Sequence, residues 1–319
     1  MGVLIFIILI GVGIYLYLNY QKAKKNIFIA NTVKAITQTK GVPSDFFTHS
    51  VNTNMEHIKS LAQLDQKLHP QKSWAECLAD SIEINYAVEL FNQKLKTVLE
   101  VLNWYKSYNL QYYSDTYNHT NLEYYLRKNK DRVEEIYNME VFDVGCISNF
   151  SGMTTRTITE IPVFIKKLPN LKAIIMGSAT SPEIYSVALG ELDLNILVEC
   201  SNLQVACFQY CNIRSIKFHG ERKISKLRHL KLGANELKEI PDTLCKLNSL
   251  EVLTLWQNEL TELPLKIGEL TNLKGLDIMS TKISYLPKSI INLNLKTFYY
   301  DDNIQFSYQE KIWLKNNNL

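Results

Sequence analysis

The sequence predicts an α/β chain in which a horseshoe-shaped solenoid of short repeats follows an α-helical domain and an N-terminal transmembrane helix. Three observations lead to this prediction. Residues 3–18 form an apolar run without a charged side chain. Between residues 46 and 138, apolar residues recur every three or four positions, which is the spacing of helices. Between residues 227 and 293, a pattern of leucines returns with a period of 23 residues, and periods of this length indicate a solenoid.

The composition is that of an ordinary folded protein. The chain has 319 residues, of which 46% are hydrophobic, and its formal net charge is +3. This charge is too small to favour a nucleic-acid partner. The six cysteines are scattered along the chain, and this favours reduced thiols in a protein that faces the cytosol.

Residues 1–20 are predicted to be an uncleaved membrane anchor. As a helix, the 18 residues that end at Leu18 extend about 27 Å, which reaches across a thin bilayer. A cleaved signal peptide is the alternative, but it requires a basic start and small residues at the cleavage site. Here no Lys or Arg precedes the run, and large residues such as Tyr17 follow it. The first lysines, Lys22 and Lys24, come after the run, so we expect the bulk of the chain to be cytoplasmic.

Residues 21–45 are predicted to be a basic juxtamembrane linker. They contain five lysines and one acidic residue, Asp45. Such a segment either lies against anionic lipid headgroups or forms a solvated spacer.

Residues 46–138 are predicted to be a helical domain. A first helix ends at His69-Pro70, and Ser73-x-x-Glu76 has the pattern of a capping box that opens a long second helix. Thr120-x-x-Glu123 has the same pattern and predicts a third helix. The apolar positions of the first two helices include Leu64, Leu78, Ile84, Val88, Leu95 and Leu102. No strict heptad supports dimerisation through the long helix, so we expect this domain to cover the open end of the solenoid.

Residues 139–306 are predicted to form about seven repeats, and residues 307–319 a C-terminal cap. The clearest three repeats begin at Leu227, Leu250 and Leu273 and follow the pattern L-x-x-L-x-L-x-x-N-x-L-x-x-L-P. Weaker versions place four more repeat starts at Met139, Leu171, Leu203 and Leu295. The two earliest intervals are 32 residues long, nine more than the regular period. The surplus is either drift in the outer repeats or a pair of loops that contact a partner.

This pattern resembles the leucine-rich repeat family, and in particular its 23-residue intracellular class, with repeats similar to the Ras group. The resemblance covers roughly residues 139–314. It implies leucines that point inward and stack on those of the next repeat. It also implies that Asn235, Asn258 and Asn303 bond their side-chain amides to the backbone of neighbouring turns. Relatives of this class bind proteins such as small GTPases and phosphatases, so the resemblance implies a protein partner.

A binding surface is predicted on the concave side of the solenoid, where residues between the inward leucines face solvent. We expect Trp256, Met279 and Tyr299 to form one apolar patch, since Trp and Tyr often carry binding energy. The alternative is that Trp256 folds over neighbouring side chains and only covers the sheet. The candidate site residues are Tyr210, Lys231, Thr254, Trp256, Asp277, Met279, Tyr299 and Asp301.

No catalytic, cofactor-binding or metal-binding pattern appears in the sequence. The only clustered thiols, Cys200, Cys207 and Cys211, lack a C-x-x-C spacing. We therefore predict a non-enzymatic, membrane-anchored scaffold or recruitment factor that binds another protein and uses no cofactor and no nucleic acid. Two alternatives stay open: a secreted or surface repeat protein with a cleaved signal peptide, and an enzyme hidden in the helical region.

Overall fold

The computed structural model describes residues 52–108, 110, 113–144, 157–177, 187–221 and 224–319. The chain divides into two compact units, Met1–Gln93 and Lys94–Leu319. The predicted anchor (1–20) and basic linker (21–45) lie outside the described residues. Within the described ranges, no helix is both long and apolar enough to cross a membrane.

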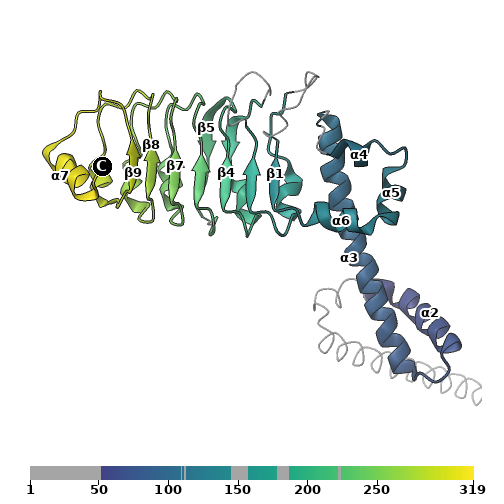
Figure 1. The fold of residues 1–319 in the computed structure, drawn as a ribbon. Coiled ribbons are helices and arrows are strands. Elements are labelled where there is room, and N and C mark those ends of the chain that lie inside the picture. The colour runs from purple at the N-terminus through teal and green to yellow at the C-terminus, as the bar shows by residue number, and fades with distance from the viewer. Residues whose placement is uncertain (1–51, 109, 111–112, 145–156, 178–186, 222–223) are drawn as a thin grey trace, which may run out of the picture. The chain divides into compact units, whose positions relative to one another are not determined.

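The described part of the first unit is a pair of helices. Helix α2 (Asn52–Leu68) lies beside the first half of α3 (Trp74–Ser107), as Figure 1 shows. The predicted capping box at the start of α3 is confirmed: the Ser73 N–H donates to Glu76 Oε2 at 2.7 Å, and the Glu76 N–H donates to Ser73 Oγ at 3.3 Å. The core between the two helices is built from Ile58, Ala62, Cys77, Leu78 and Ile82.

Three apolar residues of the predicted helical pattern are not part of this core. Leu64, Ile84 and Val88 have the predicted helical spacing, but their side chains are exposed. A helix that packs against one neighbour buries only one stripe of its surface, and Leu78 and Ile82 supply that stripe on α3.

The second unit contains the end of α3 and three short helices. These are α4 (Ser114–Tyr117), α5 (Leu122–Lys128) and α6 (Lys130–Tyr137). The expected third helix begins one residue later than predicted, because its N-cap is Asn121 and not Thr120. Asn121 Oδ1 accepts from the Tyr124 N–H at 3.0 Å. Asn129 then separates α5 from α6.

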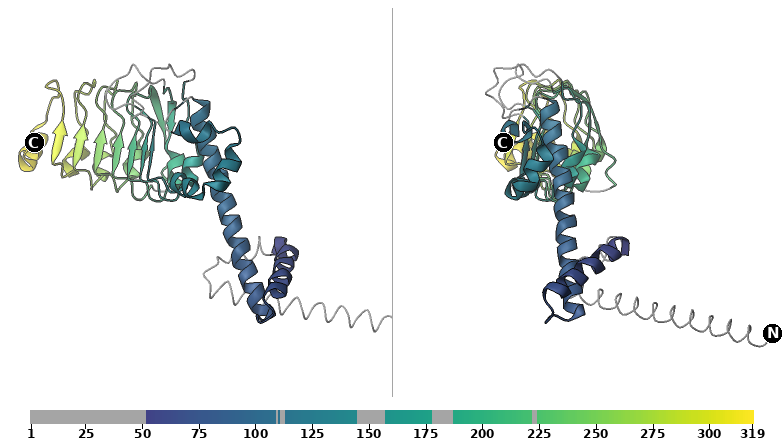
Figure 2. Two further views of the ribbon diagram at one scale, coloured as in Figure 1. Left: turned by 45° about the vertical axis from the view of Figure 1, so that its right-hand side comes forward. Right: turned by 90° about the vertical axis from the view of Figure 1, so that its right-hand side faces the viewer.

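Seven strands of the second unit form one parallel sheet in which neighbours follow chain order, as Figures 1 and 2 show. Each strand begins two residues after a predicted repeat start. The strands are β1 (Val141–Asp143), β2 (Ala173–Ile175), β4 (Val205–Cys207), β6 (His229–Lys231), β7 (Val252–Thr254), β8 (Gly275–Asp277) and β9 (Thr297–Tyr299). The middle residue of each strand is buried, so the inward side chains stack from one repeat to the next.

The return segments between the strands contain short 3₁₀ helices. They are η3 (Val163–Lys167), η4 (Leu194–Glu199), η5 (Asp242–Lys246), η6 (Ile267–Glu269) and η7 (Lys288–Asn292). A second parallel sheet of two strands, β3 (Gly190–Asp193) and β5 (Ile213–Lys217), was not anticipated. Strand β3 lies in the second of the two long intervals.

Both ends of the sheet are covered by helical residues of the second unit. At the first end, Trp104 of α3 packs on Phe142 of β1 and Phe164 of η3, with ring centroids 5.4 and 6.0 Å apart. At the other end, helix α7 (Tyr308–Asn317) carries Trp313, whose Nε1–H donates to the Leu293 carbonyl at 2.7 Å. The apolar core of the repeats is therefore closed at both ends.

Candidate functional site

The candidate site lies on the face of the sheet opposite the buried leucines, which we call the open face. Successive side chains of a strand point to opposite sides, so His229 and Lys231 lie on the open face while Leu230 between them is buried. The register pairs Lys231 with Thr254, Thr254 with Asp277, and Asp277 with Tyr299. These four residues, from four adjacent strands, form a line that we call the central row.

Trp256 follows β7 and leans toward the preceding repeat. Its ring meets that of Tyr210 edge to face, with centroids 5.7 Å apart and planes at 76°. The indole lies directly against Gly233, because a Cβ added to Gly233 would come within 2.1 Å of Trp256 Nε1. The indole is half-buried against its neighbours. These contacts agree with the alternative stated above, in which Trp256 folds over neighbouring side chains and covers the sheet.

Met279 and Tyr299 are exposed apolar residues at the C-terminal end of the open face. Their side chains are 43% and 55% exposed. Tyr299 stands in the central row, next to Asp277, whereas Met279 comes two residues after that row. The expected patch of three residues therefore consists of two exposed side chains, with Trp256 turned toward Tyr210 on the side of the earlier repeats.

Two carboxylates stand at the same end of the open face. Asp277 Oδ1 accepts from the Met279 N–H at 3.1 Å, and Asp301 Oδ2 accepts from the Ser280 N–H at 2.6 Å. Burial raises the pKa of the Asp277 carboxyl; the bond from Met279 lowers it, and the charge of Asp301 raises it further. Among the ion pairs of the described residues, none includes Asp277 or Asp301.

The other half of the central row combines a cation with an unpaired hydroxyl. Lys231 is half-buried and takes part in no ion pair within the described ranges. Thr254 Oγ1, next to it in the row, is buried and has no hydrogen-bond partner among the described residues. The row thus contains, in order, a cation, a buried hydroxyl, a carboxylate and a phenol.

Sequence reasoning missed how Gly233 positions Trp256. A signal was present, since these two residues stand 23 positions apart and so occupy equivalent places in adjacent repeats. A glycine beside a tryptophan at one repeat period indicates that the large side chain lies over the small one.

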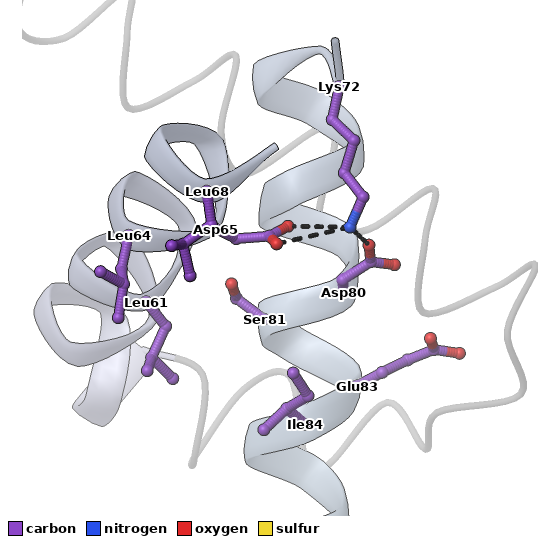
Figure 3. Close-up of a pocket in the computed structure, with 9 residues that line it drawn as sticks. All are labelled: Leu61, Leu64, Asp65, Leu68, Lys72, Asp80, Ser81, Glu83 and Ile84. Carbon is purple, nitrogen blue, oxygen red and sulfur yellow. Dashed lines mark hydrogen bonds and ion pairs between the residues drawn. The ribbon is translucent and has the colours of Figure 1, made fainter. Parts of the chain in front are cut away.

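A groove on the helix pair was also not anticipated (Figure 3). It has a volume of about 480 Å³ and lies between α2 and α3. Its polar side chains bond to one another: Lys72 Nζ lies 3.1 Å from Asp65 Oδ2 and 3.0 Å from Asp80 Oδ2. Hydrogen bonds with His69 and then with Lys72 lower the pKa of the Asp65 carboxyl. The remaining lining is mostly aliphatic, from Leu61, Leu64, Leu68 and Ile84, with Ser81 and Glu83.

The described thiols are poorly suited to nucleophilic catalysis. Burial raises the pKa of Cys200 to about 11 and that of Cys245 to about 12. Such thiols stay protonated at neutral pH and are weak nucleophiles. Within the described ranges, no group of three or more His, Cys, Asp or Glu side chains is arranged to hold a metal ion.

The fold and the open face define a class of protein: a parallel-strand repeat solenoid that presents one face of its sheet. A family model described as a leucine-rich repeat region matches residues 183–296. Residues 183–296, in the C-terminal half of the chain, are therefore a leucine-rich repeat region, as the sequence pattern predicted. A comparison with curated proteins finds no match.

Solved structures that match part of the chain include proteins of bacteria and plants. A leucine-rich repeat protein of Leptospira interrogans is 24% identical with a TM-score of 0.38, over 49% of this chain and 38% of that one. An internalin of Listeria monocytogenes is 21% identical with a TM-score of 0.35, over 46% and 39%. The Arabidopsis receptor kinase HAESA, solved with a peptide hormone and a co-receptor, is 20% identical with a TM-score of 0.38, over 51% and 26%. The chain spans about two-fifths of the length of the two bacterial proteins.

Proposed function

We propose that this chain is a leucine-rich repeat scaffold that binds another protein through the open face, on the concave side of the solenoid. The observation that carries the proposal is the pair of exposed side chains Met279 and Tyr299 beside the carboxylate Asp277. Exposed apolar side chains that cluster next to charged ones are typical of protein-binding surfaces. The buried thiols and the internally paired groove of Figure 3 offer no comparable arrangement for catalysis.

The proposal includes attachment to a membrane through residues 1–20, with the repeats in the cytoplasm. Its support is the uncharged apolar run and the lysines that follow it. The resemblance to the 23-residue class makes a small GTPase or another signalling protein the first partner to test. Sedimentation of the full chain with membranes after an alkaline carbonate wash is the expected result for a spanning anchor. A mature N-terminus near residue 20, found by mass spectrometry, would instead identify a cleaved signal peptide and reverse the expected orientation.

The binding surface is tested by affinity capture from lysate of the cells that make the protein. The test variant is a double substitution, Met279→Ala with Tyr299→Ala. The matched control is Leu265→Ala with Tyr285→Ala, which removes two apolar side chains of similar size that are 74% and 62% exposed but lie outside the strands.

We expect the native chain and the control to capture the same partner, and the test variant to lose it. Loss of about tenfold or more in affinity is the usual effect of removing two central apolar contacts. Circular dichroism must show that all three proteins are equally folded. Equal capture by the native chain and the test variant would refute the open face as the binding surface.

A further inference from the structure

The charges on the open face are arranged differently from those just beside it. The residues directly before β6, β7 and β8 form a flanking row of Arg228, Glu251 and Lys274. Here opposite charges stand on adjacent strands and pair: Glu251 lies 3.6 Å from Arg228 and 2.9 Å from Lys274. The three charges of the flanking row are therefore paired with one another.

The two charges of the central row are not paired with each other. Lys231 is on β6 and Asp277 is on β8, so that Thr254 of β7 stands between the two charges. Neighbouring strands are about 4.8 Å apart, so the two backbone positions are separated by about 10 Å. No ion pair joins the two side chains across this distance, and neither has an ion-pair partner elsewhere in the described residues. The two opposite charges of the central row are thus both unpaired.

This separation corresponds to a fixed number of residues in an extended peptide. An extended peptide in the polyproline II conformation advances about 3.1 Å per residue with three residues per turn, so side chains three residues apart lie about 9 Å apart and point to the same side. Suppose that a segment crosses β6, β7 and β8 at right angles and places an acidic side chain at Lys231. The residue three positions further along the segment then lies at Asp277. Tyr299 lies one strand beyond Asp277, at the place of a residue one or two positions further along the segment.

We propose that the open face selects an extended segment of the partner that carries an acidic and a basic side chain three residues apart, with an apolar residue just beyond the basic one. The acidic side chain pairs with Lys231 and the basic one with Asp277. The apolar residue packs on Tyr299 and Met279. This inference rests on the proposed function, because it specifies what the open face binds.

The surroundings of each charge fit this ligand. Asp301 stands close to Asp277 and adds a second negative charge at the same end of the row, while His229 lies on the same strand as Lys231. A partner cation at Asp277 offsets the repulsion between the two carboxylates.

The experiment is a selection of linear random peptides of 12 residues on the full chain, followed by affinity measurements on synthetic copies of the enriched peptides. We expect enriched peptides to contain an acidic and a basic residue at positions i and i+3, in excess over the starting library. Moving the basic residue to position i+1 or i+5 should weaken binding about tenfold, the usual scale for losing one close charge pair.

Variants of the protein give an independent readout. Lys231→Met and Asp277→Asn should each weaken the peptide about tenfold and flatten its dependence on salt, because each removes one charge pair that salt screens. Lys274→Met is the matched control: it removes a lysine of the flanking row that is already paired with Glu251, and it should change affinity less than about twofold.

The two levels of the proposal fail in different ways. Peptides that lose binding to the Met279→Ala, Tyr299→Ala variant but show no preferred charge spacing would overturn this inference and leave the proposed function standing. A selection that yields no peptide dependent on the open face would overturn both.

Discussion

Substitution of Asn235 by Ala should destabilise the repeats more than the same substitution at Asn258 or Asn303. The Asn235 side chain bonds to backbone groups of two consecutive repeats. Its Oδ1 accepts from the N–H groups of Cys211 and Ile213 at 3.0 and 3.1 Å. Its Nδ2 donates to the carbonyls of Phe208 and Leu232 at 2.8 and 2.9 Å. Alanine leaves two backbone donors without their acceptor, in a site where Asn235 itself is buried.

The magnitude follows from these bonds. A buried backbone donor left without a partner costs about 1–3 kcal/mol, so two of them cost about 4 kcal/mol. Asn258 Oδ1 accepts from one N–H, that of Leu237 at 3.0 Å, which predicts about 2 kcal/mol for Asn258→Ala. Asn303 is exposed and makes one bond, to the Ile283 carbonyl at 3.3 Å, so Asn303→Ala should cost less than about 1 kcal/mol.

The assay is hydrogen exchange of the native protein, supported by urea unfolding. Exchange is preferred because a repeat solenoid with a second compact unit does not unfold in one step. In Asn235→Ala, the amides of Cys211 and Ile213 should exchange faster than those of the other repeats. If Asn235→Ala lowers stability no more than Asn303→Ala, the bonds across repeats do not carry the stability assigned to them.

Three further predictions test individual contacts. Gly233→Ala should push the Trp256 indole off the sheet, which costs about 1–3 kcal/mol and shifts its fluorescence to longer wavelength; unchanged emission would contradict the close approach. Asp277→Asn should raise the free energy of unfolding at neutral pH by less than about 1 kcal/mol, because the folded-state pKa of this half-exposed carboxyl is raised and its ionised form opposes folding. The gain should vanish as the pH falls through that raised pKa and below the ordinary carboxyl value, and urea unfolding at pH 7 and pH 3 measures it. Trp313→Phe removes the donor to the Leu293 carbonyl and should cost about 1–2 kcal/mol, with faster exchange confined to the C-terminal cap.

The strands of the solenoid could be predicted from the sequence because a buried apolar ladder requires the same residue type at a fixed interval. Each strand begins two residues after the predicted repeat start, including the weak repeat at Met139. Capping at Ser73 could also be predicted, because it depends on residues three apart in the chain.

Features that depend on distant neighbours could not be predicted in this way. Ile84 and Val88 have helical spacing, but spacing alone does not say whether a second helix covers them. The small sheet of β3 and β5 joins segments of irregular sequence. Among the site residues, Trp256 was identified as a large side chain on the open face, yet its direction depends on the gap that Gly233 leaves one repeat earlier.

The strict register of the sheet also bears on how such a protein changes over generations. Each repeat pairs with its two neighbours only, and the period of the regular repeats is 23 residues. Duplication of one whole unit therefore lengthens the central row by one position, about 4.8 Å, and leaves every other pairing in place. A point mutation in the row changes one position of the open face and spares the leucines behind it. Descendants of this chain can thus change the open face by adding or replacing single positions, without rebuilding the fold that holds them.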